Sequence, residues 1–265
     1  MVVPKPRRRA RDGEPLPAAP DGAALLLGLG VKPASVHTPG PLGRPVGDAL
    51  DVQAAGAVGR DVREAVKAIG KVHGVGILPT IPVMENDSDK ENGSYTRTAL
   101  NQPKWITISS KGKTRKLTAA HEIGHFVEKA GVPGAVTAAG DRDWATDPFF
   151  RDWYDAVQKT EAVERIRRTA AAGSVDVHAN GEVKSVKIDQ DYTNYLLKPS
   201  ELWARSYAQY IARKSEDGDM LDSLAESLTS SESARQKTPT QWYSKDFEPV
   251  ERAIDALLSR MGWRK

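Results

Sequence analysis

The chain has 265 residues, of which 39% are hydrophobic and 28% charged, with a net charge of +3. This composition supports a folded core. The weak positive charge argues against nucleic acid as the main partner. No stretch approaches the roughly 18 consecutive apolar residues of a membrane span. Cysteine is absent, which excludes disulfides, thiolate catalysis, iron–sulfur clusters and cysteine-bound zinc, so any metal ion must be held by His, Asp or Glu.

Residues 1–47 are rich in proline and show no sustained hydrophobic period. A basic cluster at 5–11 is separated from an apolar run at 23–29 by a polar, proline-containing stretch. A secretory signal joins its basic and apolar parts directly, so we expect neither a signal peptide nor a twin-arginine signal. We expect a disordered tail; the alternative is a basic arm that contacts another chain or nucleic acid.

Hydrophobic periodicity and turn residues divide the rest of the chain into helices and strands. Pro79 and Pro82 lack the N–H that a strand ladder needs, which favours an edge position. Asn180-Gly181 predicts a hairpin turn, and Pro199 suits the first turn of a helix. In chain order, the pattern predicts a helix over residues 50–73, an edge strand or irregular extended piece over 77–83, a loop over 85–93, strands over 95–97 and 105–109, a helix over 117–130, a helical run over 147–172, a hairpin over 175–188, and helices over 201–213, 218–230 and 246–262.

This order of elements is typical of an α+β fold and not of a doubly wound α/β sheet. We expect three segments along the chain. They are a disordered or extended arm over residues 1–47, a central domain over 48–215 and a C-terminal helical extension over 216–265.

One segment of the 117–130 helix carries a pattern with defined chemistry. His121-Glu122-Ile123-Gly124-His125 fits the pattern H-E-x-x-H. Residues four apart share one face of a helix, so both imidazoles can point at a single ion. Glu122 projects beside the first ligand, where a general base for a metal-bound water belongs. The alternative is a surface helix with two solvated histidines.

A catalytic zinc site usually has three protein ligands and one water, so the motif is incomplete by itself. The extended pattern H-E-x-x-H-x-x-G-x-x-H fails because Glu128 and Gly131 occupy its glycine and last histidine positions. The downstream candidates for the third ligand are His178, Asp189, Asp191 and Glu201.

Glu201 is the favoured third ligand among these candidates. It opens a helix after Pro199, and a carboxylate there projects from a second helix that can pack across the first. His178 lies beside the Asn-Gly turn, where we expect exposure to solvent. His178, Asp189 and Asp191 stay open as alternatives.

The segment HEIGHFVEKAG, followed by YLLKPSELWARSYAQYIA, resembles zincin metallopeptidases of the gluzincin type. The closer match is to anthrax-lethal-factor-like peptidases and to the zinc peptidase domains of phage and mobile-element polyvalent proteins. The resemblance covers about residues 60–215. It implies a zincin-like fold, a small mixed sheet with an edge strand beside the active-site helix, for which we expect 105–109. It also implies Zn²⁺ bound by His121, His125 and Glu201, with Glu122 as the base.

The same resemblance assigns a role to a tyrosine shortly before the third ligand, which donates a hydrogen bond to the oxyanion. Tyr195 matches that place, with Tyr192 as the alternative. The chain departs from lethal-factor-like members at Arg205, where they carry an acidic residue. Arginine cannot accept a hydrogen bond from a ligand histidine, but it can donate to a carboxylate. The polyvalent-protein branch often has arginine there.

The implied activity is that of a zinc-dependent metalloendopeptidase that hydrolyses peptide bonds with metal-activated water and Glu122 as general base. The strand over 105–109 would align an extended peptide by edge pairing. Expected partners are a protein or peptide substrate and, through the N-terminal arm, other phage, virion or host proteins, with no membrane involved. We expect a cytoplasmic or virion-associated protein. The alternatives are a phage virion or mobile-element structural protein that keeps the zincin domain as an assembly or binding module, and an injected or secreted effector.

Overall fold

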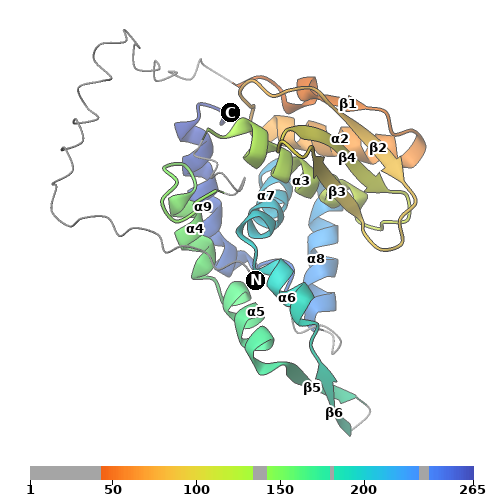
Figure 1. Cartoon of the computed structure of the whole chain (residues 1–265), viewed down its shortest axis with the longest axis vertical. Coiled ribbons are helices and arrows are strands. Elements are labelled where there is room, and N and C mark those ends of the chain that lie inside the picture. The colour runs from red at the N-terminus through yellow and green to blue at the C-terminus, as the bar shows by residue number, and fades with distance from the viewer. Residues whose placement is uncertain (1–42, 134–141, 180–181, 233–238) are drawn as a thin grey trace, which may run out of the picture. The chain divides into compact units, whose positions relative to one another are not determined.

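The computed structural model describes residues 43–133, 142–179, 182–232 and 239–265. Helices combine with a small four-stranded mixed sheet and a separate two-stranded hairpin (Figure 1), consistent with the predicted α+β class. The elements are the 3₁₀ turn η1 (Val46–Ala49), β1 (Leu50–Val52), α2 (Gly56–Val72), β2 (Ile81–Asn86), β3 (Gly93–Arg97), β4 (Pro103–Ser109), α3 (Arg115–Phe126), the π-helical turn η2 (Val127–Gly131), α4 (Arg151–Gln158), α5 (Glu161–Ala172), β5 (Ser174–Ala179), β6 (Glu182–Lys187), α6 (Gln190–Leu196), α7 (Pro199–Ser215), α8 (Gly218–Glu232) and α9 (Ser244–Arg260).

Two of the predicted helices have the wrong extent. Residues 50–52 form strand β1, because Leu50 pairs in parallel with Ile81, and the helix begins only at Gly56. The helical run over 147–172 is broken into α4 and α5, because the Thr160 side chain accepts a hydrogen bond from the backbone N–H of Val163 and caps a new helix there. The predicted hairpin is confirmed as β5–β6, although its turn residues lie outside the described part of the chain.

The strand order of the main sheet is β1-β2-β4-β3, with β1, β2 and β4 parallel and β3 antiparallel to β4. The prediction that residues 105–109 form the edge strand is therefore wrong, since β4 lies inside the sheet and β3 forms the edge. Residues 77–83 are not an edge strand either: β2 begins at Ile81 and lies between β1 and β4. Pro82 is tolerated there because the pairing of β2 with β4 begins only at Val83.

Helix α3 packs on strands β3 and β4 and, on its other side, on α7. Helix α7 is buried on almost all sides, and some of its polar residues have partners on neighbouring elements. Ser206 accepts a hydrogen bond from the Trp153 indole, and the Gln209 amide pairs with the backbone of Trp242. These hydrogen bonds replace the ones that the buried polar groups would otherwise make with water.

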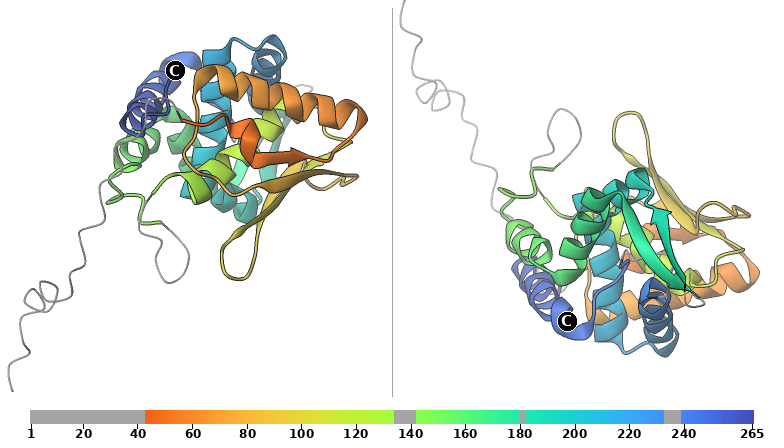
Figure 2. Two further views of the ribbon diagram at one scale, coloured as in Figure 1. Left: turned by 90° about the horizontal axis from the view of Figure 1, so that it is seen from above. Right: turned by 90° about the horizontal axis from the view of Figure 1, so that it is seen from below.

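The C-terminal helices share the core of the central part of the chain. Helix α9 lies beside α4 in every view (Figures 1 and 2), and Trp242 and Phe247 belong to the same hydrophobic cluster as α3 and α7. The predicted boundary between residues 215 and 216 thus falls between two helices of one compact unit. In the part of the chain that the structure describes, no helix has the length and apolar character needed to span a bilayer.

The end of α2 is joined to α7 by a buried histidine, His73. Its Nδ1 lies 2.5 Å from the carbonyl oxygen of Gly74, and its Nε2 lies 2.8 Å from the hydroxyl oxygen of Tyr207. A neutral ring that donates through Nδ1 and accepts through Nε2 satisfies both contacts. Burial lowers the pKa of His73 to about 4, against the smaller opposing effect of the bond to Gly74.

This buried neutral ring predicts a loss of stability in mild acid. Below the ordinary pKa of about 6.5, the unfolded chain binds a proton that the folded chain refuses, so the free energy of unfolding falls as pH drops from 6.5 toward 4. Urea unfolding at pH 7.5 and pH 4.5 should show that His73→Gln loses roughly 2 kcal/mol less than the wild type over this interval. Equal losses in the two proteins would contradict the prediction.

Candidate metal site

The H-E-x-x-H helix and the first turn of α7 bring three side chains together. His121 and His125 lie one turn apart on α3, with ring centroids 5.0 Å apart. Glu201 lies in the first turn of α7, after Pro199 at the start of that helix. Its Oε2 atom is 3.5 Å from Nε2 of His121 and 3.6 Å from Nε2 of His125.

These distances fit a tetrahedral metal site. Ligand bonds of about 2.1 Å at tetrahedral angles place neighbouring donor atoms about 3.4 Å apart. The carboxylate oxygen lies at nearly that spacing from both imidazole nitrogens. The ligand atoms of His121, Glu122 and His125 also lie within 4.8 Å of one another. The site therefore has the nitrogen and oxygen donors that Zn²⁺ prefers, in a compatible arrangement.

Two neighbours hold the Glu201 carboxylate, which is 4% exposed as a residue. The Tyr195 hydroxyl donates to Oε2 at 2.6 Å, and Nε of Arg205 lies 3.7 Å from Oε1. Burial by itself raises the pKa of Glu201, but the two histidines and Arg205 outweigh it and hold that pKa well below its usual range. The site thus favours an ionised carboxylate, the form that binds metal.

The two histidines differ in their surroundings. Burial acts to lower the pKa of both rings, but the net result differs because their charged neighbours differ. For His121 burial is the largest single effect, but the charge and hydrogen bond of Glu201 together with the charge of Glu122 outweigh it, and the pKa is raised. For His125 burial and the neighbouring His121 outweigh the bond to Glu201, and the pKa is lowered.

Glu122 faces the edge strand β3. A side-chain carbon on Gly93 would lie 3.1 Å from Cγ of Glu122, so the strand approaches the helix closely because this residue is glycine. Burial raises the pKa of Glu122 to about 7, although His121 and a hydrogen bond from the Tyr95 backbone N–H lower it. A carboxylate with this pKa can take up and release a proton near neutral pH.

Tyr195 and Tyr192 are placed differently. Tyr195 is 43% exposed, and its hydroxyl points at Glu201, while its side chain lines the cavity beside Glu122. Tyr192 is partly exposed and is not among the residues that line this cavity. Of the two, Tyr195 is the one that the structure brings next to the candidate metal ligands.

Arg205 links Glu201 to two other segments of the chain. Besides its approach to the carboxylate, the guanidinium donates to the backbone carbonyls of Leu196, at the end of α6, and of Thr240. Leu196 follows Tyr195 directly in the chain. Arg205 therefore holds both the Glu201 carboxylate and the segment that carries the Tyr195 phenol. The arginine that departs from the lethal-factor-like pattern thus forms an ion pair with a carboxylate and donates hydrogen bonds to carbonyls.

The other sequence candidates for the third ligand lie elsewhere. Asp189 caps α6 by accepting a hydrogen bond from the Tyr192 backbone N–H, and both Asp189 and Asp191 are exposed. His178 lies on strand β5, where it pairs with Val183 in the hairpin. Within residues 43–133, 142–179, 182–232 and 239–265, the structure places only Glu201 of these residues beside His121 and His125.

A cavity of about 280 Å³ opens beside the candidate ligands. It is bordered by β3 and not by β4, the strand that the sequence favoured. Gly93 and Lys129 also line it, and neither stood out in the sequence, because a strand glycine and a lysine after a helix are common. The lining residues include Glu91, Tyr95, Arg97, Glu122, His125 and Tyr195.

Comparison of the chain with protein-family models, with curated proteins and with solved structures gives no match. Function must therefore be inferred from the geometry of the site.

Proposed function

We propose that the chain is a zinc-dependent metallopeptidase of the zincin type. The observation that carries the proposal is the convergence of Glu201 on both histidines of the motif, at 3.5 and 3.6 Å, from a helix 76 residues further along the chain. Two solvated histidines on a surface helix would have no buried carboxylate aimed between them. The resemblance of the two segments to zincins supports the same conclusion.

Each residue around the site then has a chemical role. His121, His125 and Glu201 would hold Zn²⁺, which when bound activates water and polarises the scissile carbonyl. Glu122 takes the proton of the attacking water and passes it to the leaving amine. The Tyr195 hydroxyl lies next to the ligand oxygen and donates to the negative charge that develops on the carbonyl oxygen.

Strand β3 supplies a place for an extended peptide. In the described part of the chain it pairs with β4 on one side only, and its side chains border the cavity. Its free edge can therefore form main-chain hydrogen bonds with a substrate, whose side chains would then face the cavity. This replaces the predicted role of residues 105–109, which lie inside the sheet.

Metal analysis combined with a peptide-cleavage screen tests the proposal. Purified protein is expected to bind one Zn²⁺ per chain and to cleave members of a random peptide library. Chelation should abolish cleavage, and added zinc should restore it. His121→Ala serves as the control that lacks a ligand. A protein that binds zinc but cleaves nothing would instead favour the assembly or binding module.

The glycine inside the motif, Gly124, sets the distance between the two helices. A side-chain carbon there would lie 2.8 Å from Cδ1 of Tyr207 and 3.3 Å from Cα of Ala204, both on α7. Gly124→Ala should therefore push α7 away and move Glu201 from the histidines. We expect zinc affinity to fall on the order of 10-fold, as for the loss of other residues that position ligands. Competition with a fluorescent chelator measures this.

Gly70→Ala is the matched control, since nothing lies within 4 Å of a side-chain carbon at that helical position. It should leave zinc affinity unchanged and the fold as stable or slightly more stable. Equal zinc affinity in the Gly124 and Gly70 variants would mean that the helix spacing does not set the site.

A further inference from the structure

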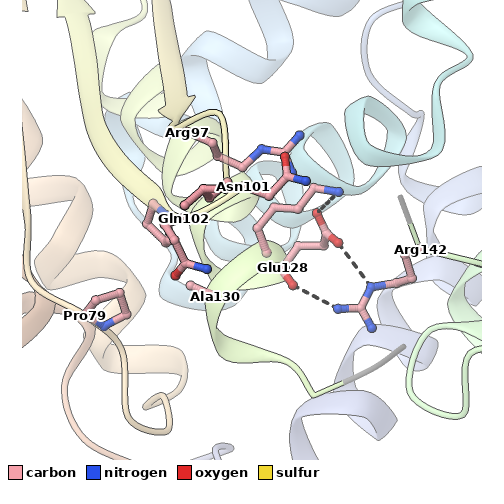
Figure 3. A pocket seen from close by; sticks show the side chains of 10 residues that line it. Pro79, Arg97, Asn101, Gln102, Glu128, Ala130 and Arg142 are labelled. Carbon is pink, nitrogen blue, oxygen red and sulfur yellow. Dashed lines mark hydrogen bonds and ion pairs between the residues drawn. The ribbon is translucent and has the colours of Figure 1, made fainter. Parts of the chain in front are cut away.

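A second cavity, of about 460 Å³, adjoins the one beside the candidate metal ligands. Arg97 and Lys129 line both, so they lie where the two cavities meet. The second cavity lies between the turn that joins β3 to β4 and the π-helical turn η2 that follows α3 (Figure 3). Asn101, Gln102 and Leu100 contribute polar and apolar surface from the turn.

The position of Arg97 follows from how β3 lies along α3. Alternate residues of a strand share one face. Gly93 packs against Glu122, and the Tyr95 ring lies 6.0 Å from the Phe126 ring, four residues further along the helix. Arg97 is the next residue on that face and so reaches the end of α3. The register of β3 and β4 shifts between Thr96 and Arg97, but the residue left without a partner is Lys104 of β4, so the alternation along β3 is kept.

The charges around this junction are not balanced. Arg142 is buried, and its guanidinium donates hydrogen bonds to Glu128, to Asp147 and to backbone carbonyls. It neutralises much of the charge of Glu128, the one carboxylate among the described residues that line the second cavity. Nζ of Lys129 lies 3.3 Å from Oε2 of Glu128, the oxygen that Arg142 does not bind. Arg97 is half-buried and has no carboxylate within 4.0 Å among the described residues.

We propose that this junction is a subsite for an acidic side chain of the bound peptide, so that the protein selects peptides with Asp or Glu near the position of cleavage. The inference rests on the proposed function, because it takes the neighbouring cavity to bind peptide. A carboxylate entering the junction meets the guanidinium of Arg97, which offers several N–H donors in one plane, and the ammonium of Lys129. It supplies the counter-charge that the described residues do not provide at Arg97.

Binding of peptide pools to the zinc-loaded Glu122→Gln protein tests this subsite without requiring turnover. Each pool holds acetylated and amidated decapeptides that are random except for one fixed residue, which is Glu, Gln or Lys. The immobilised protein should retain the Glu pools about 5-fold or more over the matching Gln pools at one or two positions, as expected for one charge-assisted contact.

Variants locate the preference. In the Glu122→Gln background, Arg97→Ala combined with Lys129→Ala should abolish the excess of Glu over Gln, and Arg97→Glu combined with Lys129→Glu should shift retention toward Lys. The matched control is Arg63→Ala combined with Lys113→Ala, which removes the same charge from two exposed positions that do not line either cavity. The control should keep the preference for Glu.

The outcomes separate the subsite from the peptidase proposal. Equal retention of Glu and Gln pools, or a preference that survives the Arg97 and Lys129 substitutions, would overturn the subsite even if the wild type cleaves peptides. A Glu preference that depends on these two residues, in a protein whose wild type binds zinc but cleaves nothing, would support the subsite and refute the peptidase.

Discussion

Replacement of Glu122 by glutamine is expected to leave zinc bound and to lower the rate of peptide cleavage by at least roughly 10²-fold. Glutamine keeps the size and polarity of the side chain but cannot take a proton from water, and loss of a general base has this scale of effect. The side chain is buried against β3, where burial raises its pKa to about 7. Zinc content and the rate of hydrolysis of a peptide from the library screen would be measured on the same preparations.

Glu91→Gln is the matched control for this substitution, because Glu91 is an exposed glutamate that lines the same cavity. It removes one negative charge without touching the ligands and should change the rate by no more than about 3-fold, the effect of a weakly coupled surface charge. Loss of zinc from Glu122→Gln would make Glu122 a ligand, an arrangement that its oxygen, within 4.8 Å of both histidine nitrogens, allows. Full activity would place the base elsewhere.

Replacement of Tyr195 by phenylalanine is expected to lower turnover by about 10²–10³-fold, the effect of removing one oxyanion donor. The hydroxyl lies 2.6 Å from Oε2 of Glu201, the same oxygen that faces both histidines. A group so close to the ligand is also close to a carbonyl oxygen drawn to the metal. Zinc affinity should change little if this donation is the main role of the phenol.

The contact with Glu201 suggests an alternative role for Tyr195, which is to orient the carboxylate. If Tyr195 serves mainly to orient the carboxylate, Tyr195→Phe should weaken zinc binding by roughly 10- to 100-fold, and saturating zinc should restore turnover. Titration of both turnover and bound zinc against free zinc distinguishes the two roles. Tyr192→Phe removes a hydroxyl from a residue that does not line the cavity, and it should leave both quantities nearly unchanged.

The site residues were easier to predict than the sheet that surrounds them. His121 and His125 are four apart in one helix, so local spacing places both on one face. Pro199 marks the start of another helix and favoured Glu201, while His178, Asp189 and Asp191 stayed open as the third ligand. The strand order depends on distant pairings, and nothing within residues 105–109 shows that β3 covers their outer side. Pro79 and Pro82 favoured an edge position for the same reason. Pro82 is accommodated inside the sheet because β1 pairs with residues 81–83 of β2, while β4 pairs with residues 83–86.

The subsite residues could not be found from sequence. Arg97 and Lys129 are 32 positions apart and meet only because β3 runs along α3, which Gly93 permits by lacking a side chain. A strand glycine usually signals a bulge or a close approach of another group, but the sequence does not show which group approaches. The role of Arg205 was similarly open until its partners, Glu201, Leu196 and Thr240, were located.

The short outer strands of the main sheet disfavour edge-to-edge pairing between sheets. A free sheet edge that accepts a substrate also accepts any other extended chain, including a second copy, and long apolar edges lead to aggregation. Here β3 has five residues and ends in Arg97, while β1, at the opposite edge, has three. Neither edge is long enough for an extended intermolecular ladder. An edge of this length engages only a few residues of any peptide, so transient capture of single segments is favoured over the stacking of whole chains.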